Sequence, residues 1–423
     1  MKKMEKAKNL KEVYNLFDPM TPLKGDYLKS FYVPPYSEIR PRLFEELKSP
    51  LLTSENPDKF LLSGYKGCGK STELNRLCTD EDIKKNFLVV KFSIKEVLDV
   101  FDFDYKDLLL VISAQIYNSA KNEKIKITKD VLNDIERWTD KIEIIKTKTK
   151  SGEVEGGVKL DFIYAKIGSW LKVEDSTRKE IRKEIKQKVS DLVYNINRML
   201  ADIQNSKPIL LVIEDLDKLP SDSAIELFYS NISPFMQLNC KIIFTFPFAL
   251  MLSHKWSIIS RTFKKPTIIP NITIHTKSGK VRERGYEIMS EIFYKRANDN
   301  LIAKEALDKC IEYSGGVVFD FIRIVSNSAN VAMVKRKEMI EEDDVLEVVI
   351  SMRDDYAFLT KEHIEKLKEV YKNKAAIVEE GSNTIRDLIA SLCILKYYNA
   401  EPWYDVHPII EHNVNPIIEI IEK

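Results

Sequence analysis

The chain has 423 residues, of which 44% are hydrophobic, so it is long enough for two or three globular domains with a substantial core. Its 66 basic residues are balanced by 65 acidic ones, which excludes a global positive field that would attract nucleic acid or an anionic membrane. Binding to either partner would therefore require a local patch.

The first residues, MKKMEKAK, are charged and contain no apolar segment, which predicts no signal peptide. The longest apolar run, residues 242–252, contains Pro247 and is shorter than the ~20 residues of a membrane-spanning helix. The five cysteines and five histidines are dispersed, without metal-ligand spacing or a Ser/His/Asp pattern. We expect a cytoplasmic protein with no membrane segment and no Cys/His metal centre.

The first 50 residues carry six prolines between short helical patterns, which predicts an N-terminal arm that wraps on the core. Residues 31–36, FYVPPY, are the most aromatic part of this arm. We expect these aromatic residues to anchor the arm, and the alternative is that they pack against an adenine base.

A glycine-rich loop follows, in residues 60–72, with the sequence FLLSGYKGCGKST. Its spacing matches GxxxxGK[ST], and it lies between an apolar strand pattern and a helical one, as a phosphate-binding loop does. The glycines let backbone N–H groups point at phosphate oxygens, Lys70 pairs with the β- and γ-phosphates, and Ser71 takes one position on Mg²⁺. We expect ATP to contact Gly64, Tyr65, Lys66, Gly67, Cys68, Gly69, Lys70, Ser71 and Thr72.

Apolar strand patterns and helical patterns then alternate, as in a parallel sheet covered by helices on both faces. Residues 87–92 predict a buried strand and residues 105–120 a helix. An insertion at about 121–205 interrupts this rhythm with a hairpin at Gly156 and one long helix that begins near Thr177. The apolar stripe of that helix predicts core packing or a partner-helix face. Nucleic-acid contact on its basic face is the less favoured alternative, because acids are interleaved.

A second chemical signal is the apolar run 208–213, which ends in Glu214 and Asp215. A buried strand of this kind delivers its acids to the carboxyl edge of the sheet, where ligands bind. One acid would hold Mg²⁺ and the next would orient the attacking water. Residues 241–247 predict a further strand whose Thr245 reaches the γ-phosphate or that water, and residues 267–274 predict an edge strand.

From residue 282 to about 353 the pattern is helical, which predicts an α-helical lid. The tail has two helical segments and then two short strands that turn at Asn399, as in a winged-helix-like module. Between residues 385 and 423 there are three basic residues against six acidic ones, which favours a protein partner over DNA for this module.

Together, the phosphate loop, the strand ending in Glu214 and Asp215, the Thr245 strand, the helical lid and the terminal module resemble AAA+ ATPases. The resemblance is closest to the origin-recognition and STAND-like branches, and similar stand-alone ATPases occur in bacterial conflict and antiphage loci. It implies an α/β P-loop NTPase fold, a parallel sheet sandwiched by helices, with ATP and Mg²⁺ as ligands. The implied parts are an arm (1–50), a core (51–275), a lid (276–354) and a winged-helix-like domain (355–423).

The resemblance also places an arginine finger, acting on the ATP of a neighbouring subunit, at Arg261, with an ordinary surface arginine as the alternative. Where the family has a second-sensor arginine, this chain has Phe319, and the nearest arginine is Arg323. The family has Asp then Glu, or two Asp, where this chain has Glu214 then Asp215. This reversal displaces each carboxylate by about a bond length, and a misplacement of ~1 Å can cost ~10² in rate, so we expect slow hydrolysis.

The leading hypothesis is a slowly hydrolysing ATPase that forms homo-oligomers as a switch, with a role in bacterial defence. Its protein partner would bind the C-terminal module or the insertion. The alternative within the same fold is a DNA-binding, origin-recognition-like ATPase, and the alternative of another class is an ATP-gated scaffold without hydrolysis. A small-molecule kinase is least favoured, because of the lid and tail. The best local candidates for DNA contact are Lys146, Lys148 and Lys150, with the basic face near Arg178 and Arg182.

Overall fold

The computed structural model describes residues 4–34, 43–135, 137–138, 175–378, 382–399 and 401–414. The predicted hairpin at Gly156 and the three lysines Lys146, Lys148 and Lys150 lie outside these residues. The chain divides into two compact units, each described by itself. Unit 1 consists of Met1–Leu47, Ser63–Leu77 and Thr267–Lys423, and unit 2 consists of Lys48–Leu62 and Cys78–Pro266.

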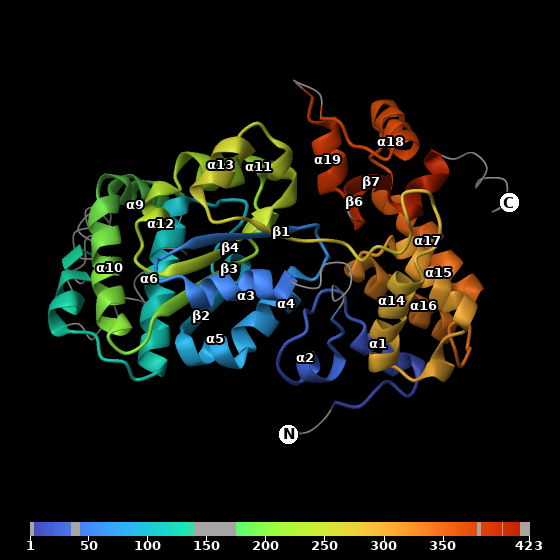
Figure 1. Cartoon of the computed structure of the whole chain (residues 1–423), viewed down its shortest axis with the longest axis horizontal. Coiled ribbons are helices and arrows are strands. Elements are labelled where there is room, and N and C mark those ends of the chain that lie inside the picture. Colours follow the sequence, from blue (N-terminus) through green and yellow to red (C-terminus); the bar gives the residue numbers. More distant parts are fainter. Residues whose placement is uncertain are drawn as a thin grey trace. The chain divides into compact units, whose positions relative to one another are not determined.

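A five-stranded sheet has the order β2-β3-β4-β1-β5, with helices on both sides of it (Figure 1). The strands are β1 (Lys59–Gly64), β2 (Leu88–Ser93), β3 (Ile209–Glu214), β4 (Lys241–Pro247) and β5 (Thr267–Ile269). Each strand predicted for this sheet is present, but β5 is shorter than the expected 267–274. Pro270 follows its last residue, and a proline cannot donate to a strand ladder.

The interior strands are apolar because both of their faces are covered. All six residues of β1 and all six of β3 are buried. In the parallel register of β2 with β3, Ser93 is the partner of Glu214, so both strands present polar side chains at the same carboxyl edge. The parallel pairing of β3 with β4 continues the sheet.

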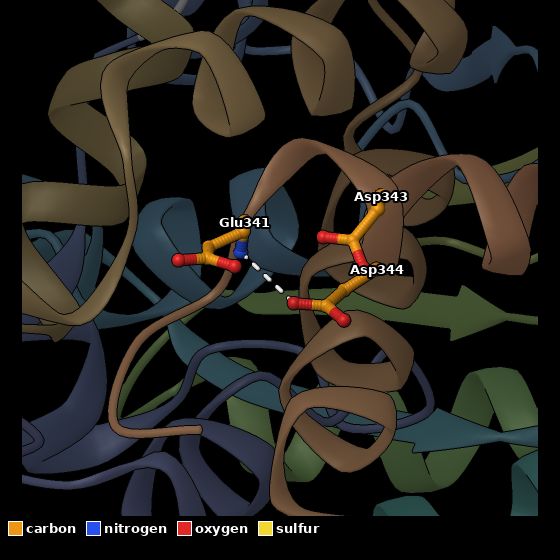
Figure 2. Close-up of side chains that lie close together, drawn as sticks. All are labelled: Glu341, Asp343 and Asp344. Carbon is orange, nitrogen blue, oxygen red and sulfur yellow. Dashed lines mark hydrogen bonds between the residues drawn. The ribbon is translucent and has the colours of Figure 1, made fainter. Parts of the chain in front are cut away.

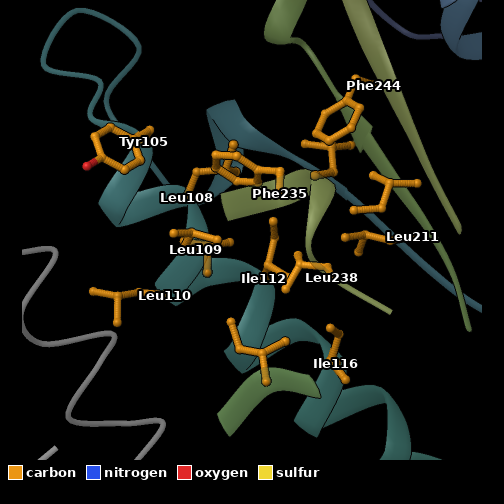
Figure 3. Close-up of a cluster of buried hydrophobic side chains, with 14 of the residues drawn as sticks. Tyr105, Leu108, Leu109, Leu110, Ile112, Ile116, Leu211, Phe235, Leu238 and Phe244 are labelled. Atoms are coloured by element: carbon orange, nitrogen blue, oxygen red, sulfur yellow. The ribbon is translucent and has the colours of Figure 1, made fainter. Parts of the chain in front are cut away.

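The core of unit 2 lies between the sheet and the helices that pack on it. Figure 3 shows α6 side chains, including Leu108 and Ile112, facing Leu211 of β3 and Phe244 of β4. The helices that belong wholly to unit 2 are α5 (Glu81–Asn86), α6 (Tyr105–Asn122), α9 (Asp175–Gln187), α10 (Val189–Gln204), α11 (Ser221–Ile225), α12 (Ser233–Met236) and α13 (Trp256–Thr262), while α3 (Leu43–Thr53) and α4 (Lys70–Thr79) span the unit boundaries.

The long helix expected from Thr177 to about residue 204 is instead two helices, α9 and α10. The helical ladder breaks at Lys188, whose N–H closes a tight turn onto the Ile185 carbonyl at 2.9 Å. The apolar stripe continues across the break, because Ile185 in α9 and Leu192 in α10 both belong to the same core. Tertiary packing of the stripe therefore outweighs continuity of the helix.

Unit 1 is mainly helical and ends in a helix–hairpin module. The arm contributes α1 (Leu10–Leu16) and α2 (Gly25–Phe31), and α1 packs on α16. In the register of the C-terminal hairpin, Asn399 is the partner of Glu401, so the predicted turn is confirmed. The other elements are α14 (Glu283–Arg296), α15 (Lys304–Ser314), α16 (Val318–Val334), α17 (Glu342–Met352), α18 (Lys361–Asn373), α19 (Thr384–Ala390), β6 (Ile394–Asn399) and β7 (Glu401–Val406).

The predicted fold class is confirmed: a parallel sheet between helices is followed by a run of four helices and a winged-helix-like module. Among the described residues, none of the helices is both long and apolar enough to span a membrane. Short 3₁₀ and π turns connect the elements at η1 (Ile94–Glu96), η2 (Leu216–Lys218), η3 (Glu226–Ser230), η4 (Phe248–Leu252), η5 (Asp299–Leu301), η6 (Arg353–Tyr356) and η7 (Pro408–Asn413).

Candidate functional site

The loop between β1 and α4 has the backbone of a phosphate-binding loop. Gly67 and Gly69 have φ values of 83° and 98°, which a side chain with a Cβ adopts only under strain. Tyr65 and Cys68 are 3% and 1% exposed, whereas Lys66 is exposed. The loop therefore offers backbone groups to an anion, and its bulky side chains fill the interior.

Lys70, the first residue of α4, is held against the loop. Its ammonium donates to the carbonyl oxygens of Gly64 at 3.0 Å and Tyr65 at 2.8 Å, and the residue is 8% exposed. The start of α4 adds the positive end of its dipole at the same place. These features fit a bound polyphosphate, for which Lys70 would supply the cation and the loop its N–H groups.

The N-terminal arm fastens onto α4 just beyond the loop. The N–H of Leu23 donates to the hydroxyl of Thr72 at 3.3 Å, and the amide of Asn75 donates to the Leu23 carbonyl at 2.8 Å. The hydroxyl of Tyr32 donates to Glu73 at 2.7 Å. Arg76 in turn donates to the Tyr32 hydroxyl at 3.0 Å. These contacts favour the anchoring interpretation of the arm's aromatic residues, and Pro35 and Tyr36 lie outside the described residues.

The predicted acids lie together at the end of β3, in unit 2. Glu214 is 8% exposed, and its carboxylate pairs with the ammonium of Lys91 on β2 at 2.6 Å. A metal that binds Glu214 would therefore share the carboxylate with Lys91 or displace it. The prediction that Ser71 and Glu214 hold Mg²⁺ joins residues of unit 1 and unit 2, and it stays a prediction.

Asp215 occupies a left-handed backbone conformation, with a φ of 66°, at the start of η2. Aspartate tolerates this conformation better than most residues. Lys218 pairs with its carboxylate at 2.5 Å, and the hydroxyl of Ser93 donates to it. Burial raises the pKa of Asp215, but the bonds from Lys218 and Ser93 outweigh burial, so its pKa is lowered overall. The carboxylate is thus held ionised, as a group that orients water needs to be.

Thr245, on β4, is 2% exposed and holds the turn that carries the acids. Its hydroxyl accepts from the N–H of Leu216 at 3.0 Å and donates to the Ile213 carbonyl at 3.4 Å. The hydroxyl is therefore engaged by the backbone on either side of Glu214 and Asp215. Contact of Thr245 with a γ-phosphate or water stays a prediction.

The two arginines that the resemblance drew attention to lie in different units. Arg261 is exposed in the last turn of α13, in unit 2. Arg323, in unit 1, pairs with Asp355 at 2.5 Å. Exposure is compatible with a finger that acts on a neighbouring subunit, and that role of Arg261 stays a prediction.

The two arginines of the predicted basic face, Arg178 and Arg182, point inward. Arg178 donates to Asp107 at 3.0 Å, and Arg182 pairs with Asp107 at 2.6 Å and with Asp102 at 2.8 Å. Asp107 is 2% exposed and Arg178 9%. The two arginines compensate buried carboxylates, so the structure corrects their assignment as candidates for DNA contact.

An acidic cluster at the start of α17 is the group of side chains, among the described residues, whose spacing would suit a metal ion. Figure 2 shows Glu341, Asp343 and Asp344, with the N–H of Glu341 donating to Asp344 at 3.0 Å. Lys337 pairs with all three carboxylates, and Lys335 with both aspartates. Lys337 and then Lys335 lower the pKa of Asp343 to about 2. We assign the cluster to helix capping and charge pairing.

The part of the chain that carries the loop and most of the sheet matches a known domain family. Residues 40–243 match the model of the KAP family P-loop domain. The prediction of a P-loop fold is thereby confirmed for this part of the chain. None of the functionally curated proteins matches the sequence.

Several solved structures resemble this chain over most of its length. Orc1 of Aeropyrum pernix, in complex with DNA, is 13% identical, with 96% of this chain and 98% of Orc1 covered and a TM-score of 0.41. Cdc6p of Pyrobaculum aerophilum is 13% identical, with 97% of this chain and 98% of Cdc6p covered and a TM-score of 0.43. RuvB, the Holliday junction branch migration motor of Thermotoga maritima, is 14% identical, with 93% of this chain and 91% of RuvB covered and a TM-score of 0.39. Likeness at this level carries no conclusion about function.

Sequence reasoning missed three residues that contact the predicted site residues. Lys91 and Ser93 reach Glu214 and Asp215 because β2 pairs with β3, and no local pattern in the sequence indicates that pairing. The third is Phe319, whose N–H donates to the carbonyl of Gly67 at 3.1 Å. In the sequence, Phe319 drew attention only because AAA+ ATPases have a second-sensor arginine at that position.

Proposed function

We propose that this protein binds ATP with Mg²⁺, hydrolyses it slowly and works as a nucleotide-dependent oligomeric switch. The observation that carries the proposal is the loop itself. Gly67 and Gly69 hold left-handed backbone angles directly before α4, and the Lys70 ammonium lies against the loop carbonyls. This is the arrangement in which a polyphosphate is bound by backbone N–H groups and one cation.

Slow hydrolysis is supported by the surroundings of the acid pair. Lys91 pairs with Glu214, and Lys218 and Ser93 hold Asp215, so both carboxylates are committed to protein partners. A bound Mg²⁺ would neutralise phosphate charge, while the protein's own residues position ATP, hold the metal and orient water. We expect turnover well below the ~1–100 s⁻¹ of efficient phosphoryl-transfer enzymes, which suits a switch that stays loaded.

The test is light scattering after size exclusion, with and without a non-hydrolysable ATP analogue, combined with phosphate release from ATP. We expect the analogue to shift the protein to a larger assembly and ATP to be turned over slowly. Binding and assembly without any phosphate release would favour an ATP-gated scaffold instead. A protein that neither binds the analogue nor assembles would contradict the proposal. A role in bacterial defence and a protein partner for the C-terminal module extend this proposal and rest on the resemblance alone.

DNA binding is the second candidate function, and the described residues favour it less. Arg178 and Arg182 are engaged by buried acids. The exposed lysines of α9, among them Lys179 and Lys183, alternate with Glu180 and Glu184. A protein that makes several phosphate contacts usually shows a concentrated basic surface. We expect weak binding at most, without sequence preference, in a salt titration with duplex DNA.

A further inference from the structure

The turn that links α15 to α16, together with the first turn of α16 (residues 315–320), packs on the tip of the phosphate loop within unit 1. The N–H of Phe319 donates to the Gly67 carbonyl at 3.1 Å. A Cβ added to Gly67 would lie 2.5 Å from the Cβ of Phe319 and 3.2 Å from Val317. The loop and the turn therefore approach each other at backbone distance, which requires glycine at position 67.

The same turn is held by the C-terminal hairpin. The hydroxyl of Tyr397, a fully buried residue of β6, donates to the Gly315 carbonyl at 2.7 Å. His407, which follows β7 and is also fully buried, lies 3.2 Å from the carboxylate of Asp320. The N–H of Ile409 donates to Nδ1 of His407 at 3.3 Å, so the ring proton is on Nε2 and is donated to Asp320.

These contacts form a continuous chain. His407 holds Asp320, and the preceding residue, Phe319, holds Gly67 through its N–H. The Gly67–Cys68 peptide is fixed at both ends, because the Cys68 N–H donates to the Tyr65 carbonyl at 3.3 Å. A loop whose peptides are already oriented loses less conformational freedom when it binds a ligand.

We propose that Phe319 and His407 are positioning residues of the phosphate loop, through which the C-terminal module sets nucleotide affinity. The proposal rests on nucleotide binding at this loop, as proposed above. Coupling between two sites is reciprocal, so bound nucleotide must stabilise the contact between hairpin and turn by the same factor. The C-terminal module is thereby a part of the molecule that responds to nucleotide.

The first test needs no nucleotide. Hydrogen exchange of the peptide that covers residues 63–70 is measured in the full chain and in four variants. His407→Ala and Phe319→Pro should both speed exchange of the loop amides, because proline removes the N–H that donates to Gly67 and is tolerated in the first turn of a helix. His407→Gln keeps an N–H donor near the Nε2 position and should restore slow exchange. Val370→Ala, which removes buried volume from α18 of the same module, is the matched control and should leave the loop unchanged.

The second test is calorimetric titration with Mg·ATP. We expect His407→Ala and Phe319→Pro to weaken binding about tenfold, within the 5–150-fold range usual for coupled sites. His407→Gln and Val370→Ala should stay within about threefold of the parent. In the parent, ATP should slow exchange in β6 and β7. Loop exchange and ATP affinity that are both unchanged in folded His407→Ala and Phe319→Pro proteins would overturn the proposal. A parent that binds no ATP would instead refute the proposed function, while the exchange test still decides the positioning role.

Discussion

At the scale of single residues, Lys70 is a cation with 8% exposure whose ammonium already has two carbonyl partners. When ATP binds, phosphate oxygens can replace those carbonyls, so the positive charge of Lys70 stays compensated. Without Lys70, a bound polyphosphate has no ammonium partner for its negative charge. Lys66 belongs to the same loop but is exposed. The two lysines therefore allow a matched comparison.

We predict that Lys70→Ala abolishes detectable ATP binding, at a cost of several kcal/mol. Lys66→Ala should bind like the parent, because it removes only an exposed side chain and keeps the backbone N–H through which residue 66 would contact ATP. Both variants should keep the parent's near-ultraviolet circular dichroism. Calorimetry measures the affinity. Unchanged affinity in Lys70→Ala would remove the assignment of this loop.

The acid pair gives a second prediction. Asp215→Asn should remove the residual hydrolysis while ATP stays bound, because Asn tolerates the left-handed backbone that Asp215 has and no strain is added. Glu214→Gln should instead weaken the dependence of ATP binding on Mg²⁺. Phosphate release and binding at varied Mg²⁺ distinguish the two roles. If Asp215→Asn hydrolyses ATP normally and Asp217→Asn is inactive, the catalytic role belongs to Asp217.

At the scale of elements, the contact between α9 and the start of α6 rests on buried charge. Arg182→Ala leaves Asp107 with Arg178 alone and leaves Asp102 without its Arg182 partner, so we predict a loss of about 2 kcal/mol or more in the free energy of unfolding. Lys186→Ala, an exposed change on the same helix, should stay within ±0.5 kcal/mol. Urea denaturation measures the free energy of unfolding of both variants. An Arg182→Ala protein that is as stable as the parent but loses DNA binding would reverse our assignment.

The C-terminal hairpin has a pH dependence that follows from His275. Its ring lies 5.2 Å from that of Tyr397 and 5.3 Å from that of Trp403, and burial, followed by the charge of Lys374, lowers the pKa of His275 to about 4. Asp405 is 3.8 Å from His275 but is paired with Lys374 at 2.6 Å, so it does not reverse this direction.

Because the folded pKa of His275 lies below the unfolded value, the unfolded chain binds the proton first as pH falls. The stability is fully present above about pH 6.5 and declines as pH falls toward 4, by roughly 2–3 kcal/mol in total. His275→Gln should flatten this part of the stability curve, and His254→Gln, at an exposed site, should not. Thermal unfolding between pH 4 and 7 measures the difference. Equal slopes in the parent and His275→Gln would contradict the assignment.

At the scale of the whole molecule, assembly and hydrolysis are linked if Arg261 acts on a neighbour's ATP. Arg261→Ala should bind ATP like the parent but lose hydrolysis, since a finger is worth ~10³–10⁵ in rate and acts only in the transition state. Mixing Arg261→Ala with Lys70→Ala should restore part of the turnover, because each supplies what the other lacks. No rescue, together with a monomeric protein in the presence of ATP, would exclude the role.

Local sequence chemistry by itself determined the loop, the strands and the helix–hairpin tail. The strand-to-loop-to-helix order, the glycines before Lys70 and the apolar run before Glu214 each combine neighbouring residues, so backbone propensity and burial pattern suffice to predict them. The same holds for the turn at Asn399.

The tertiary structure alone decided which distant groups compensate one another. Nothing local indicates that β2 lies beside β3 and brings Lys91 to Glu214, or that Arg178 and Arg182 turn inward to Asp107. The same is true of Phe319, which meets Gly67 across 252 positions of the chain. The physical reason is that burying a charge or closing a backbone contact is favourable only once a partner is present, and the fold of the whole chain supplies that partner.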